Sequence, residues 1–96
     1  MMSLNAASER AIGDARELLE RLAETYEGTA AALERSATLA ETHAERQQRA
    51  GRSKAAEDEH RTAEWAREAA QRARKAATRA REAAQRAPLA RRRLTR

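Results

Sequence analysis

A seven-residue repeat constrains this chain more than any other feature. Residues 66–72 read AREAAQR, residues 73–79 read ARKAATR, and residues 80–86 read AREAAQR again. A period of seven returns to the same face of an α-helix every two turns, so this repeat predicts a helix with one alanine face. We expect that helix to run from about 54 to 87. Its stripe comprises alanines 66, 69, 70, 73, 76, 77, 80, 83, 84 and 87.

The first half of the chain repeats with the same period but carries larger side chains. One row of residues seven apart begins at Ile12, a second contains Leu18, and a third contains Leu22. Three adjacent rows form a stripe that is wider than a two-stranded seam requires. We therefore predict a first helix over about 4–48, with a face broad enough for two neighbours.

The segment 49–53 is predicted to be a tight turn between the two helices. Gly51 can adopt the left-handed conformation that ends a helix, and Ser53 suits the cap position of the next one. Two long helices joined by so short a turn are expected to pack side by side in opposite directions. Counting outward from the turn places Ala73 opposite Gly28.

Pro88 is expected to end the second helix, because proline lacks the backbone N–H that continues the ladder. Residues 89–96 are then a basic tail without regular structure. The predicted fold class is therefore all-α: one antiparallel two-helix hairpin over residues 1–88, coiled-coil-like in its packing.

Composition excludes several other classes of protein. The chain of 96 residues contains no Cys and no Phe, so a disulfide framework is impossible and an aromatic-rich β-sandwich is not expected. No apolar run approaches the roughly 18 residues that cross a bilayer, so we expect no membrane contact. No leader for secretion is expected at the start of the chain, which favours a cytoplasmic protein.

The apolar side chains predict self-association. An alanine methyl contributes only about 0.8 kcal/mol on burial, so the Leu, Ile and Tyr side chains of the first helix are expected to supply nearly all packing volume. A single hairpin leaves part of that broad stripe uncovered, and we predict a dimer of hairpins that forms a four-helix bundle. The expected core and interface residues are Ile12, Leu18, Leu19, Leu22, Tyr26, Leu33, Leu39, Trp65, Ala70, Ala73, Ala77 and Ala80.

Charge is distributed unequally between the halves. Residues 1–48 carry nine acids and five bases, net −4, whereas residues 49–96 carry six acids and fifteen bases, net +9. An acidic helix beside a basic one favours the hairpin, although each exposed ion pair contributes only about 0–1 kcal/mol. The competing hypothesis is nucleic-acid binding through the phosphate backbone. Its residues are Arg79, Arg81, Arg86, Arg91, Arg92, Arg93 and Arg96.

No motif in the sequence indicates catalysis or a cofactor. Glu57 and His60 have the spacing of a carboxylate-bridged metal ligand pair in helix bundles. At about 100° per residue, however, both side chains point away from the alanine stripe, so no metal site is expected. The sequence therefore predicts a non-catalytic helical module that binds a second copy or a partner protein.

Overall fold

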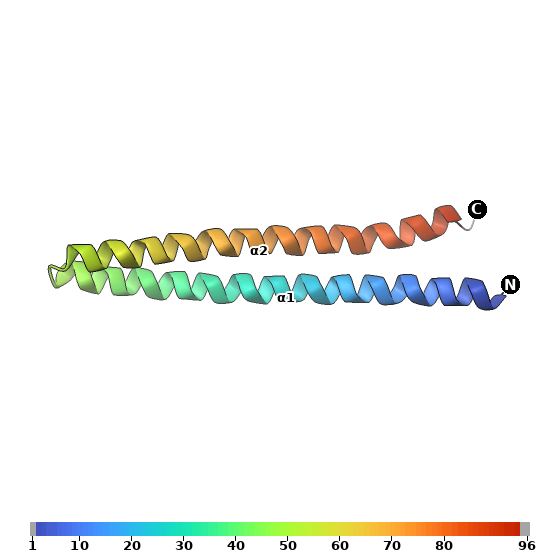
Figure 1. Cartoon of the computed structure of the whole chain (residues 1–96), viewed down its shortest axis with the longest axis horizontal. Coiled ribbons are helices and arrows are strands. Elements are labelled where there is room, and N and C mark those ends of the chain that lie inside the picture. Colours follow the sequence, from blue (N-terminus) through green and yellow to red (C-terminus); the bar gives the residue numbers. More distant parts are fainter. Residues whose placement is uncertain (1, 95–96) are drawn as a thin grey trace. The chain divides into compact units, whose positions relative to one another are not determined.

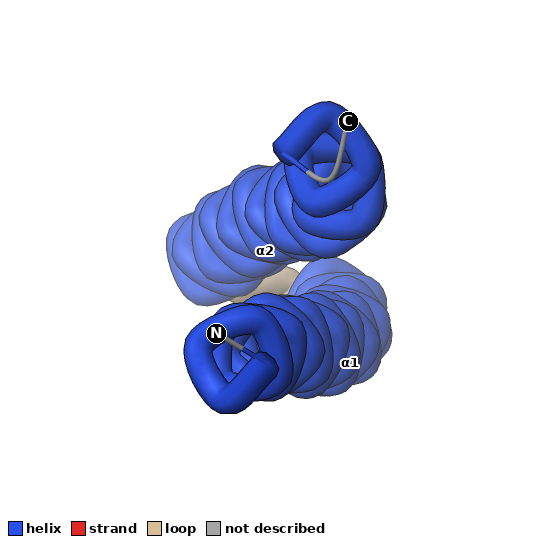
Figure 2. Tube along the Cα trace, turned by 90° about the vertical axis from the view of Figure 1, so that its right-hand side faces the viewer, coloured by secondary structure: helices blue, strands red, loops and turns tan. Residues whose placement is uncertain are grey.

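The computed structural model consists of two long α-helices and, over the part of the chain it describes, no strand. Helix α1 spans Met2–Arg49 and helix α2 spans Ser53–Leu94 (Figure 1). The structure describes the backbone of residues 2–94 and the side chains of residues 5–87. The two helices pack as a hairpin, so the predicted all-α hairpin is confirmed (Figure 2).

The turn between the helices closes through glycine, as predicted. Gly51 has φ 76°, the one positive φ among the described residues. The Gly51 N–H donates to the Gln48 carbonyl at 3.0 Å, and the Arg52 N–H donates to the Gln47 carbonyl at 2.8 Å. This pair of bonds is the Schellman motif, which satisfies carbonyls that the end of α1 would otherwise leave unpaired.

Helix α2 begins and ends differently from the prediction. Its first backbone bond runs from the Ala56 N–H to the Arg52 carbonyl at 3.1 Å, so the cap position is Arg52 and Ser53 is the first helical residue. The helix also continues through Pro88 to Leu94. The predicted end of the helix at 87 is therefore wrong, and so is the prediction of a tail without regular structure over 89–94. Proline removes one helical hydrogen bond, and neighbouring residues with high helix propensity can still carry the helix past it.

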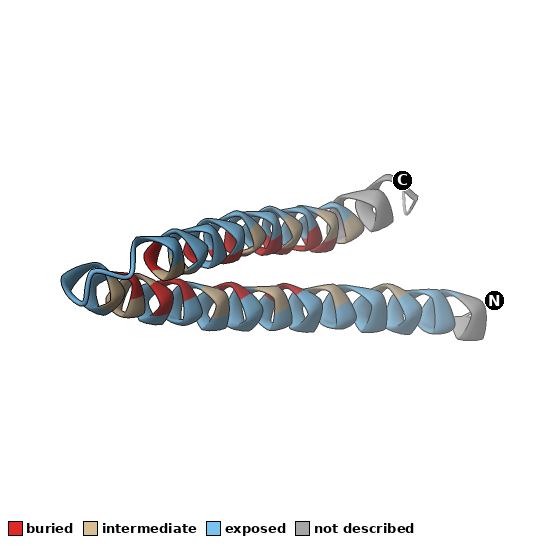
Figure 3. Ribbon diagram, turned by 60° about the vertical axis from the view of Figure 1, so that its left-hand side comes forward, coloured by how far each residue is buried: buried red, intermediate tan, exposed pale blue. Residues whose placement is uncertain are grey.

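The buried seam between the helices is made of alanine alone. Every buried residue among those with described side chains is an alanine, and no larger side chain is fully buried (Figure 3). The prediction that Leu, Ile and Tyr of α1 supply nearly all the packing volume holds only in part: Tyr26 and Leu33 pack half-buried against the alanine clusters, whereas the fully buried positions are alanines. Small side chains allow two helix axes to approach closely, and the row of alanines on α1 does this better than the leucine rows beside it. The buried alanines on α1 are Ala23, Ala30, Ala37, Ala40 and Ala44; those on α2 are Ala56, Ala63, Ala66, Ala70, Ala73, Ala77, Ala80 and Ala84.

The contacts divide the chain into two compact units. Unit 1 comprises Met1–Tyr26 and Lys75–Arg96, and unit 2 comprises Glu27–Arg74. In unit 1, Ala23 packs with Ala77 and Ala80, and the half-buried Tyr26 covers them. In unit 2, one cluster joins Ala30 to Ala70 and Ala73 with Leu33 against it. Ala73 thus lies within one helical turn of its predicted place opposite Gly28.

Candidate functional site

Two leucines of unit 1 are exposed outside the alanine seam. Leu18 is 64% exposed and Leu22 is 43% exposed. Leu22 borders a shallow groove of about 340 Å³, whose walls come from both helices of unit 1. We call this surface the apolar groove; it is lined by Leu19, Leu22, Tyr26, Ala76, Arg79, Ala80 and Ala83. The leucines on the α1 wall form a ridge, and this ridge lies beside a row of alanines on the α2 wall.

Unit 2 also exposes two large apolar side chains. Leu39 is 57% exposed and Trp65 is 61% exposed. Leu39 stands two residues before Glu41, and Trp65 stands two residues before Arg67. Glu41 and Arg67 form an ion pair with each other. Two residues correspond to about 200° around a helix, so Leu39 and Trp65 lie on the side of unit 2 away from that ion pair.

The other side of unit 2 carries ion pairs between the helices. Arg74 Nη1 donates to Glu34 Oε1 at 2.6 Å, and Arg67 Nη1 donates to Glu41 Oε1 at 3.3 Å. The same carboxylate oxygen of Glu41 lies 3.4 Å from His60 Nδ1. These five residues, which we call the charged flank, confirm that basic residues of α2 pair with the acidic first helix.

Hydrogen bonding on the charged flank shifts three pKa values. The hydrogen bond from Arg74 lowers the pKa of Glu34, and the same bond raises the pKa of Arg74. The pKa of Glu41 is lowered first by the hydrogen bond with His60 and then by the bond from Arg67. For Glu34 and Glu41 these bonds favour the deprotonated, charged carboxylate. Because these side chains remain substantially exposed, their main effect is to set how the helices are oriented.

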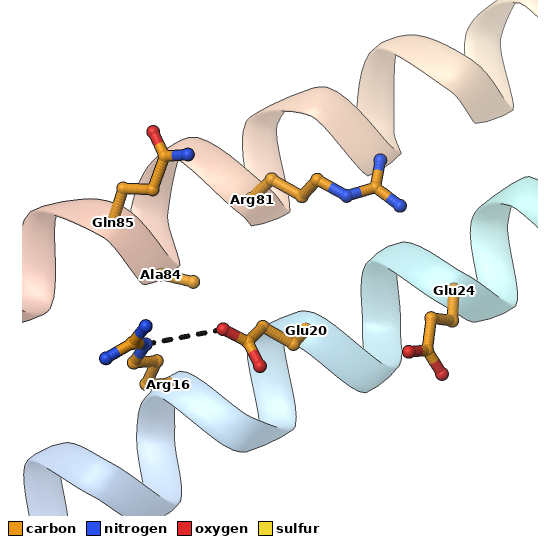
Figure 4. A pocket seen from close by; sticks show the side chains of 6 residues that line it. All are labelled: Arg16, Glu20, Glu24, Arg81, Ala84 and Gln85. Carbon is orange, nitrogen blue, oxygen red and sulfur yellow. Dashed lines mark hydrogen bonds and ion pairs between the residues drawn. The ribbon is translucent and has the colours of Figure 1, made fainter.

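Unit 1 contains a polar hollow between its two helices. It has a volume of about 260 Å³ and is lined by Arg16, Glu20, Glu24, Arg81, Ala84 and Gln85. Arg16 Nε donates to Glu20 Oε1 at 3.3 Å, and the Arg81 side chain extends from α2 beside the same hollow (Figure 4). The lining contains the arginines Arg16 and Arg81 and the glutamates Glu20 and Glu24, so its charges balance and it offers no excess charge to a ligand.

The structure brings only part of the predicted core into the seam. Ala70, Ala73, Ala77 and Ala80 are buried, while Ile12, Leu19, Tyr26 and Leu33 are half-buried at its edge. Leu18, Leu22, Leu39 and Trp65 are exposed and take no part in the hairpin seam.

Sequence reasoning missed the central row of α1, which is Ala23, Ala30, Ala37 and Ala44. These alanines recur every seven residues, with the same period as the alanine stripe of α2. Matching the two alanine periods could have identified them, but the leucines in the neighbouring rows gave a stronger apolar signal.

The predicted nucleic-acid residues fall into separate groups. Arg79 and Arg86 are exposed, and neither forms an ion pair with any residue whose side chain is described. Arg81 lines the polar hollow and is engaged in interactions of its own. The side chains of Arg91, Arg92, Arg93 and Arg96 lie outside the described residues.

Other site types and known proteins add no candidate. Within the described residues, no group of His, Asp and Glu is arranged to hold a metal ion. Neither helix contains, over its described length, a stretch apolar enough to span a bilayer. No protein-family model, curated protein or solved structure matches the chain. The candidate functional surface therefore rests on the exposed apolar side chains.

Proposed function

We propose that this protein is a non-catalytic helical interaction module that associates with a second copy, forming a four-helix bundle from two hairpins. The observation that carries the proposal is that small apolar residues are buried while large ones are exposed. Alanines fill the seam, whereas Leu18, Leu22, Leu39 and Trp65 remain exposed. Exposed apolar surface of this kind marks an interaction site when it gathers on one face. Its proposed compartment is the cytoplasm, which rests on the sequence alone and is tested by cell fractionation.

The energetics favour association over a solitary hairpin. Burying a leucine side chain contributes about 1.5–3 kcal/mol, whereas an alanine methyl contributes about 0.8 kcal/mol. The hairpin alone buries only the smaller kind of side chain in its seam. A second hairpin that covers Leu18 and Leu22 would add the larger contributions.

Sedimentation velocity tests the proposal directly. We expect the wild-type chain to sediment at micromolar concentration as a species of twice the chain mass. Replacing Leu22 with Asp should dissociate that species, because the variant places a charge in the apolar groove. The matched control is Gln71→Asp, which adds the same charge at an exposed position of α2 and should leave the mass unchanged. A fully helical wild-type monomer would contradict the proposal.

Nucleic-acid binding is the second candidate function. Its support is that Arg79 and Arg86 are exposed and unpaired within the described side chains, one heptad apart on α2. Two arginines so placed could contact a phosphate backbone without reading base sequence. Retention on duplex DNA at about 150 mM salt would favour this function. Loss of retention on truncation before Pro88 would assign it to the basic C-terminal residues, and no retention of the intact chain would remove it.

A further inference from the structure

We infer that two copies pair with their turns at the same end, so that α1 of one copy covers the α2 wall of the apolar groove in the other. This inference rests on the proposed self-association and specifies its geometry. The occupant of the groove is the leucine ridge of a second copy, Leu18 and Leu22. Each copy then provides both a ridge and a groove, which is the self-complementary pattern that a two-fold axis requires.

The shape of the groove in unit 1 favours this arrangement. One wall is bulky, with Leu19, Leu22 and Tyr26, and the other wall consists of Ala76, Ala80 and Ala83 with Arg79 beside these small residues. A two-fold axis parallel to the helices places the bulky wall of each copy over the small wall of the other. An axis across the helices would instead place bulky α1 on bulky α1 and small α2 on small α2, which packs less evenly.

Charge at the groove favours the same pairing. The α1 wall contains no charged residue, whereas Arg79 stands on the α2 wall. Pairing α2 with α2 of the second copy would bring two copies of Arg79 together, and pairing α1 with α2 avoids this like-charge contact. Charge complementarity across an interface selects the partner and its orientation, and like-charge contacts disfavour the alternative.

Two exposed charges that lie about one helical turn beyond the groove are consistent with the same pairing. Ala23 of α1 packs with Ala77 of α2. Asp14 lies nine residues before Ala23, and Arg86 lies nine residues after Ala77. Asp14 and Arg86 are therefore at the same level along the hairpin, and both are exposed. Neither forms an ion pair among the described residues. In the same-end arrangement, Asp14 of one copy comes beside Arg86 of the second copy, and each interface contains this pair twice.

Cysteine cross-linking tests the arrangement, because the native chain contains no Cys. Single-cysteine variants Leu22→Cys and Ala76→Cys are mixed in equal amounts and oxidised mildly. A disulfide forms only when the Cβ atoms come within about 4.5 Å. We expect the mixed disulfide at least tenfold in excess over the disulfide between two Leu22→Cys chains, which reports opposite-end pairing, because that pairing lays α1 on α1 over the groove. Gln71→Cys, on another side of α2, is the control and should give no mixed product with Leu22→Cys.

The outcomes separate this geometry from self-association itself. A dimer by sedimentation together with the Leu22→Cys and Ala76→Cys product supports both. A dimer that cross-links instead between two Leu22→Cys chains overturns the same-end arrangement and leaves self-association intact. A wild-type monomer removes both at once.

A charge-reversal cycle tests the same geometry without touching the apolar groove. We expect Asp14→Arg or Arg86→Asp alone to weaken the dimer Kd by roughly tenfold, because each substitution alters both Asp14–Arg86 pairs of the interface. The double variant should recover most of the loss, since it restores opposite charges across the interface. Additive weakening in the double variant would overturn the pairing of Asp14 with Arg86, and circular dichroism confirms that each variant remains helical.

Discussion

Unit 2 and unit 1 both bury alanines between their helices, but the residues beside these alanines differ. In unit 2, the Glu34–Arg74 and Glu41–Arg67 pairs connect the two helices beside the seam. In unit 1, Leu18 and Leu22 stand exposed beside an open apolar groove. An exposed ion pair is stable in water, whereas exposed leucine gains free energy when it is covered. The comparison teaches that the rows beside an alanine seam decide which side chains the hairpin satisfies by itself. The charged flank is satisfied by pairs between the helices, whereas Leu18 and Leu22, like Leu39 and Trp65 of unit 2, remain exposed and need a partner.

The largest expected effect comes from enlarging the seam that both units share. Replacing Ala23 in unit 1 or Ala30 in unit 2 with Leu should each destabilise the hairpin by about 1–3 kcal/mol, because both alanines are essentially inaccessible to solvent. The control Ala31→Leu adds the same volume at an exposed position and should change stability by less than about 0.5 kcal/mol. Urea unfolding followed by circular dichroism measures the difference. Equal effects for Ala30 and Ala31 would refute the seam.

Two glycine substitutions should follow, with opposite signs. Gly51 has a positive φ, so Gly51→Ala should cost about 1–2 kcal/mol by straining the turn of unit 2. Gly28 lies within α1 with open space around it, so Gly28→Ala should stabilise the helix by about 1 kcal/mol. Thermal unfolding of both variants provides the measurement. A stabilising Gly51→Ala would mean that the turn does not depend on left-handed backbone.

The smallest effect concerns pH and the charged flank. The pKa of Glu34 is lowered in the folded state by its hydrogen bond from Arg74, so the associated stability is present above the ordinary carboxyl pKa of 4.5. This stability is lost as the pH falls through the folded pKa, because protonation breaks the bond. Glu34→Gln should therefore lower the thermal midpoint slightly at pH 7 and show a weaker decline on acidification than the wild-type chain.

Glu64→Gln is the matched control for that measurement, because Glu64 is exposed and makes no ion pair among the described residues. It should reproduce the wild-type pH dependence. An identical decline in the Glu34→Gln and wild-type proteins would show that the ion pairs of unit 2 add nothing to the shared seam.

Much of the fold was predictable because its signals are local. The seven-residue period of 66–86 and the good helix formers around it predict α2, and Gly51 predicts the turn. The end of α2 was not predictable in the same way, since Pro88 is a strong helix breaker by itself and the helix nevertheless continues to Leu94. The stripe of alanines on α2 was identified correctly, because alanine fills that face without larger competitors.

The interaction surface was predictable only in part. Leu18, Leu22, Leu39 and Trp65 stood out as large apolar residues, and their exposure is what makes them candidates for contact with a second copy. The sequence could not show which of them face the hairpin partner. Four adjacent rows on α1, three with large apolar residues and one with alanines, are all compatible with a buried face.

The sequence by itself determined two helices, their period and the glycine turn, because helix propensity and left-handed backbone depend on neighbouring residues only. Only the tertiary structure decided which row of α1 enters the seam. The physical reason is the distance between the helices: alanine facing alanine permits the closest approach, which leaves Leu18, Leu22 and Leu39 exposed beside the seam. Local sequence contains no information about that distance, which arises only when the two helices meet.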